Sequence, residues 1–89
     1  MLNLDLLNIE ELQEIVQKAE SDVTNYAKEL FPTKPQGYVK AVNLLVKYAK
    51  AKIEAMEDRL KGRISRADKH QETANNFWRV LPDYCKWDN

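Results

Sequence analysis

The stretch LKGRISRAD, residues 60–68, decides between two architectures because it lies in the middle of a long helical pattern. Gly62 favours a helix end here, since glycine is common just after the last turn of a helix. Against an end, Leu60 and Ile64 are four residues apart and would share one face of a continuous helix. A glycine inside a helix costs only about 1 kcal/mol relative to alanine. We therefore predict that one helix runs through this stretch, and a break at Gly62 is the alternative.

An apolar stripe extends from this stretch in both directions, with its members four, three and four residues apart. All but one of its twelve members are apolar: Tyr38, Val42, Leu45, Ala49, Ile53, Met56, Leu60, Ile64, Ala67, Gln71, Ala74 and Trp78. This repeat corresponds to about 3.67 residues per turn, so the stripe stays on one helix face with little supercoiling. The pattern predicts a helix over about 36–78, which would be about 64 Å long at about 1.5 Å per residue.

A shorter helix is predicted upstream, over about 9–31. Asn8 occupies the N-cap position, and Glu11 completes a capping-box pattern three residues later. Apolar residues then recur at heptad spacing: Ile9, Leu12, Val16, Ala19, Val23, Tyr26 and Leu30. Pro32 ends the pattern because proline disfavours helical geometry in the residue before it. The loop over 32–35 is short, so the two helices are expected to run antiparallel.

The composition indicates an all-α protein with a single domain over residues 1–89. Only 2 glycines and 3 prolines occur, and 31% of the residues are charged, which is typical of long helices. A chain of this length buries a small core, and the second predicted helix is about 30 Å longer than the first. We therefore predict an antiparallel helical hairpin whose long second helix pairs with a second copy in a four-helix-bundle homodimer. The alternative is a compact three-helix bundle broken at Gly62. The predicted dimer seam consists of Met56, Leu60, Ile64 and Ala67.

The sequence offers no set of residues that catalysis would need. His70 is the single histidine and Cys85 the single cysteine, which excludes a metal site built from several such ligands. Neither a G-x-G-x-x-G motif, nor a P-loop, nor a nucleophile elbow occurs. We predict a non-enzymatic protein without a cofactor or a bound metal.

The N-terminal segment does not have the pattern of a signal peptide, because polar residues interrupt its apolar positions and no basic residue precedes them. The sequence also contains no apolar run of about 18 residues, so we expect no membrane span. A single cysteine fits a reducing compartment, and the expected location is the cytoplasm.

The net charge of zero hides an asymmetry. Residues 1–31 carry seven acidic side chains against two lysines, whereas residues 32–89 carry seven acidic side chains against twelve lysines and arginines. Such halves pair more often within a fold, or between identical chains, than with a foreign polyelectrolyte.

A basic stripe lies on one face of the second predicted helix: Arg59, Arg63, Arg66 and His70. This stripe makes a nucleic-acid-binding helical hairpin dimer the alternative function. No aromatic residue is interleaved with it for base stacking, so we favour pairing with acidic groups of another copy.

Half of the eight aromatic residues fall in the last fifteen positions: Phe77, Trp78, Tyr84 and Trp87. Trp78 belongs to the apolar stripe, whereas Tyr84 and Trp87 follow Pro82 in a tail over 79–89. Aromatic side chains with a polar group are enriched at interfaces, so these four are partner-binding candidates. The other interpretation is that the tail docks on its own helices. We predict a protein-interaction or regulatory module that acts as a homodimer and binds a further protein.

Overall fold

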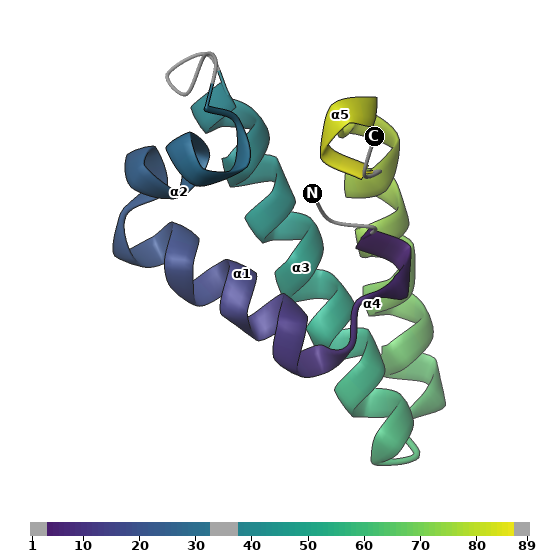
Figure 1. The fold of residues 1–89 in the computed structure, drawn as a ribbon. Helices are drawn as coiled ribbons and strands as arrows, with labels where there is room; N and C mark the ends of the chain where they lie inside the picture. Colours follow the sequence, from purple (N-terminus) through teal and green to yellow (C-terminus); the bar gives the residue numbers. More distant parts are fainter. Residues whose placement is uncertain (1–3, 33–37, 87–89) are drawn as a thin grey trace.

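The computed structural model describes residues 4–32 and 38–86, apart from the side chains of Asp5, Tyr84 and Lys86. Every regular element in these ranges is helical, which confirms the predicted all-α class. The elements are η1 (Leu4–Leu6), α1 (Ile9–Ser21), α2 (Val23–Leu30), α3 (Val39–Leu60), α4 (Ile64–Val80) and α5 (Asp83–Lys86) (Figure 1).

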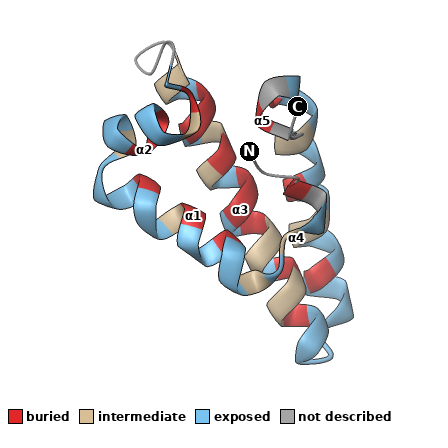
Figure 2. Ribbon diagram, viewed as in Figure 1, coloured by how far each residue is buried: buried red, intermediate tan, exposed pale blue. Residues whose placement is uncertain are grey.

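α3 is the central helix of the fold. α4 runs antiparallel to it on one side, and α1 and α2 pack against it on the other (Figure 1). η1 contacts α5, so the beginning and the end of the described chain meet on the α4 side. Since α3 has neighbours on both sides, its core residues Val42, Leu45 and Tyr48 are buried (Figure 2).

The predicted helix over 9–31 is wrong in one respect, because Asp22 divides it into α1 and α2. Asp22 has an extended backbone, with φ −160° and ψ 93°, and its side chain accepts a hydrogen bond of 3.1 Å from the backbone N–H of Asn25. An aspartate side chain competes in this way with the helical hydrogen bonds of the main chain. Because of this new N-cap, α2 starts in a different direction from α1 and buries its residues Tyr26 and Ala27 in the core.

The predicted continuous helix over 36–78 is also wrong. It ends at Leu60, and α4 starts at Ile64 after a turn that contains Gly62. The alternative break at Gly62 therefore describes this chain, although Asp22 adds a further helix to the expected three. The predicted loop over 32–35 lies outside the described residues apart from Pro32.

The C-terminal part of the described chain packs on its own core. The rings of Trp78 and Tyr48 lie 5.5 Å apart between centroids, which joins α4 to α3. Beyond α4, Leu81 and Cys85 are buried at 3% exposure each, in the same cluster as Leu4. Leu81 and Cys85 thus bring the segment that begins the predicted tail into contact with the N-terminal segment.

Candidate functional site

The turn between α3 and α4 brings together most of the residues that the sequence singled out. Its backbone forms a Schellman motif, in which the N–H of Arg63 donates to the carbonyl of Asp58 at 2.8 Å. The N–H of Gly62 donates to the carbonyl of Arg59 at 3.1 Å. Gly62 has φ +77°, a left-handed conformation that a residue with a β-carbon rarely adopts. The glycine therefore sets the point at which α3 stops.

A charged cluster lies directly under this turn. Asp58 is 6% exposed, and its carboxylate lies 3.9 Å from the guanidinium of Arg63, 3.8 Å from Nε of Arg66 and 3.6 Å from Nε2 of His70. The other ring nitrogen of His70, Nδ1, lies 3.0 Å from a carboxylate oxygen of Glu54. These five residues, Glu54, Asp58, Arg63, Arg66 and His70, are called the charged cluster below.

The charged cluster joins the end of α3 to the start of α4. A Schellman turn is often accompanied by an apolar contact between the residues at the positions of Asp58 and Arg63, and here an ion pair takes its place. Asp58 Oδ2 is buried and, among the described residues, accepts no hydrogen bond, so the guanidinium groups of Arg63 and Arg66 beside this carboxylate supply the compensating charge. The cluster thus compensates this buried oxygen through charge rather than through hydrogen bonding.

The charged cluster lines a shallow depression of about 250 Å³, together with Glu57 and Lys61. Both ring nitrogens of His70 face carboxylates of the same chain, at 3.0 and 3.6 Å. That arrangement engages both ring nitrogens of His70 within the fold. We find no group of three or more potential metal-binding side chains in residues 4–32 and 38–86.

The structure divides the predicted basic stripe. Arg63, Arg66 and His70 surround Asp58, whereas Arg59 is exposed and does not line the depression. Closer to the N-terminus of α3 than the charged cluster, the ammonium of Lys52 donates a hydrogen bond of 2.8 Å to the side-chain oxygen of Gln71, which adds a second link between α3 and α4. Burial, and to a lesser extent the positive charge of Arg59, lowers the pKa of Lys52.

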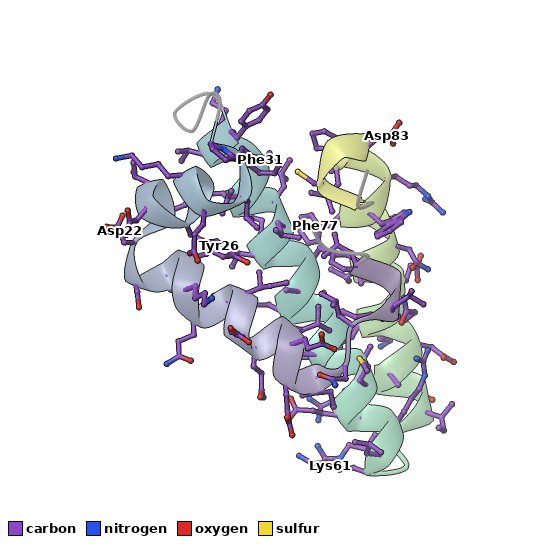
Figure 3. All side chains as sticks on the ribbon, viewed as in Figure 1. Asp22, Tyr26, Phe31, Lys61, Phe77 and Asp83 are labelled. Atoms are coloured by element: carbon purple, nitrogen blue, oxygen red, sulfur yellow. The ribbon has the colours of Figure 1, made fainter. Side chains whose placement is uncertain are left out.

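The predicted dimer seam is split in the same way. Ala67 is fully buried between α3 and α4, and Met56 is half-buried beside the start of α1. Leu60 and Ile64, at the two ends of the turn, are 80% and 57% exposed. Leu60 and Ile64 thus flank the turn at the tip of the α3–α4 hairpin, whose Lys61 is labelled in Figure 3, and are called the exposed apolar pair below. The charged side chains of Arg59, Lys61 and Arg63 are exposed in the same stretch of sequence.

The aromatic candidates follow a different pattern. Phe77 and Trp78 are half-buried and pack against the core. The side chain of Tyr84 and all of Trp87 lie outside the described residues.

A groove between α1 and α2, which the sequence did not predict, is a further surface feature. It measures about 400 Å³, and its lining includes Glu29 and Tyr26, the second of which is labelled in Figure 3. Lys18 lies 3.2 Å from Glu14 and 4.0 Å from Glu29 at this site. Burial raises the pKa of Tyr26 to about 12, and Glu29 and Glu14 add to the shift. The turn at Asp22 brings Tyr26 and Glu29 of α2 beside Lys18 of α1, and recognising that cap in the sequence would have indicated the groove.

Comparisons with protein-family models, with curated proteins and with solved structures found no match to this chain. Across residues 4–32 and 38–86, none of the helices combines the length and the hydropathy that crossing a bilayer requires.

Proposed function

We propose that this chain is a non-enzymatic helical interaction module that acts as a homo-oligomer and uses the tip of the α3–α4 hairpin as its contact surface. The exposed apolar pair carries the proposal, because Leu60 and Ile64 are 80% and 57% exposed, whereas the neighbouring stripe members Met56 and Ala67 are half-buried and buried. Burial of a leucine or isoleucine side chain contributes about 1.5–3 kcal/mol, so leaving two of them in water favours association.

The surroundings of the pair support an interaction surface rather than a reaction site. Apart from the exposed side chains of Arg59 and Lys61, the charged groups near the pair are those of the charged cluster, in which Asp58 and the two guanidinium groups compensate one another within the chain. Phe77 and Trp78, which the sequence offered as partner contacts, are half-buried and pack against the chain's own core. The single cysteine remains compatible with the cytoplasm as the proposed location.

Sedimentation equilibrium tests the proposal on the wild-type chain and two variants. The wild-type chain is expected to associate at micromolar concentration, and the double variant Leu60→Lys with Ile64→Lys is expected to remain near 10.4 kDa. Val80→Lys is the matched control, because Val80 is 60% exposed at the far end of α4. A wild-type chain that stays monomeric throughout, or equal dissociation by Val80→Lys, would contradict the proposal.

Nucleic-acid binding is the second candidate, since the side chains of Arg63 and Arg66 remain 52% and 63% exposed. It is less well supported, because both guanidinium groups lie within 4 Å of Asp58 and are partly neutralised. Binding of a duplex or hairpin RNA or DNA more tightly than about micromolar at physiological salt, with a steep salt dependence, would favour this candidate.

A further inference from the structure

The groove between α1 and α2 is acidic and partly apolar. It consists of two adjoining hollows of about 400 and 230 Å³, and Lys18, Tyr26 and Glu29 line both of them. Ile15 and Leu30 add apolar surface to the smaller hollow. Four carboxylates line the two hollows: Glu11, Glu14, Asp22 and Glu29. Since Lys18 is the one cation among the described lining residues, the groove carries a net negative charge beside apolar side chains.

Tyr26 places an unused polar group in this groove. Its side chain lies between α1 and α2 and is 6% exposed, and its hydroxyl forms no hydrogen bond with another described residue (Figure 3). The negative charges of Glu29 and Glu14 act on the phenol, which shows that the hydroxyl end faces the carboxylates of the groove. A buried hydroxyl without a partner is unfavourable. An ammonium or guanidinium group that enters the groove can donate a hydrogen bond to this hydroxyl and pair with the carboxylates.

We propose that the groove binds the tip of the α3–α4 hairpin of a second copy. The tip carries the exposed cations Arg59 and Lys61 next to the exposed apolar pair, Leu60 and Ile64. Cations and apolar side chains are the two kinds of group that the groove complements. The groove also belongs to the acidic part of the sequence, residues 1–31, and the tip to the basic part, residues 32–89. This contact rests on the proposed function, because it names the surface to which the tip binds.

The position of the two surfaces makes the contact intermolecular. α2 packs beside the N-terminal part of α3, whereas the tip follows the C-terminal end of α3 (Figure 1). A chain therefore cannot fill its own groove with its own tip. Since the tip and the groove are different surfaces, a copy bound through its tip still has a free groove, and assembly continues head to tail beyond the dimer.

Two variants that each remove one surface test this contact by sedimentation equilibrium. Leu60→Ser with Ile64→Ser removes the apolar part of the tip without changing the net charge, and should weaken association about 10-fold or more. Glu29→Lys reverses a charge of the groove and should weaken association roughly 5- to 30-fold, because attraction between exposed charges becomes repulsion. Glu72→Lys is the matched control, since Glu72 is an exposed glutamate of α4 outside both hollows, and should associate like the wild type.

The decisive sample is an equimolar mixture of the tip variant and Glu29→Lys. At a concentration where each alone stays near 10.4 kDa, the mixture should reach about twice that mass and no more, because one intact tip meets one intact groove. The wild type should exceed the mass of a dimer as its concentration rises. Attraction between net charges cannot imitate the mixed dimer, because the tip variant is neutral overall. Misfolding cannot imitate it either, because the contact needs both variants folded.

The results separate this contact from the proposed function. If Glu29→Lys associates like the wild type while the tip variant does not, the groove is not the binding surface, and the proposed self-association stands. A mixture that remains monomeric would likewise overturn the contact between tip and groove. A wild-type chain that stays monomeric throughout would contradict both proposals.

Discussion

Replacing Gly62 with alanine distinguishes the closed turn from a continuous helix by the sign of the change in the monomer's free energy of unfolding. In the turn, φ is +77° and, apart from the adjacent residues, no atom lies within 4 Å of the position that a β-carbon would take, so the cost is backbone strain alone. A residue with a β-carbon loses about 1–2 kcal/mol in this conformation. The reduced freedom of the unfolded chain returns about 0.4–1 kcal/mol. The monomer should therefore lose about 1 kcal/mol, whereas in a continuous helix the same change would stabilise it by about 1 kcal/mol.

Thermal and urea unfolding of the monomer fraction from gel filtration, at submicromolar concentration, measures this difference. A loss of about 1 kcal/mol lowers the melting temperature by about 4–8 °C in a domain of this size. Gly62→Asn is the matched control and should cost less than alanine, because asparagine tolerates the left-handed conformation better. A Gly62→Ala monomer that is as stable as the wild type or more stable would refute the Schellman turn.

Three further predictions concern the charged cluster, the α1–α2 groove and the first helix. Replacing Arg63 and Arg66 together by alanine should cost about 1–2 kcal/mol in urea unfolding, since the buried carboxylate loses two cations, whereas Arg59→Ala should change little. The urea concentration at the wild-type unfolding midpoint should decrease as the pH is raised above 10, because the phenol of Tyr26 has a pKa near 10.0 in the unfolded chain and about 12 in the folded one. Tyr26→Phe should make this decrease smaller. Asn8→Ala should cost about 1 kcal/mol of unfolding free energy, because its side chain accepts the capping hydrogen bond of 2.8 Å.

Each of these predictions has a result that contradicts it. Equal losses for Arg59→Ala and for the double arginine variant would mean that the carboxylate does not depend on its neighbours. An unchanged decline above pH 10 in Tyr26→Phe would assign the decline to other groups. A neutral Asn8→Ala variant, measured with the exposed Gln13→Ala as its control, would show that the capping box contributes nothing to folding.

The sequence predicted the helical class and the start of the first helix because both depend on local signals. The capping box at Asn8 and Glu11 forms with both of its hydrogen bonds, at 2.8 and 3.2 Å. The apolar stripe correctly identified Val42, Leu45 and Ala49 as buried positions of α3. Such patterns need no knowledge of which helices become neighbours.

The two breaks escaped prediction for opposite reasons. Asp22 lies within a regular heptad pattern, so periodicity concealed a side chain that caps a new helix. Gly62 is recognisable as a possible helix end. A glycine inside a helix costs little, however, and the apolar stripe keeps its spacing across Gly62, so the sequence alone favoured a continuous helix. The long-range contacts of α4 with α3, including the pairing of Asp58 with Arg66, could not be weighed from the sequence.

The basic stripe shows why residue types alone did not locate the site. Arg63, Arg66 and His70 have the spacing of an exposed cationic face, and no local signal indicates that Asp58 is their partner. Once the chain reverses at Gly62, the start of α4 lies beside the end of α3, and the aspartate in the last turn of α3 meets the cations that follow the reversal. The same reversal leaves Leu60 and Ile64 in solvent. One glycine thus produces both a neutralised charge cluster and an exposed apolar pair, because it ends α3 at Leu60 and lets the chain reverse into α4.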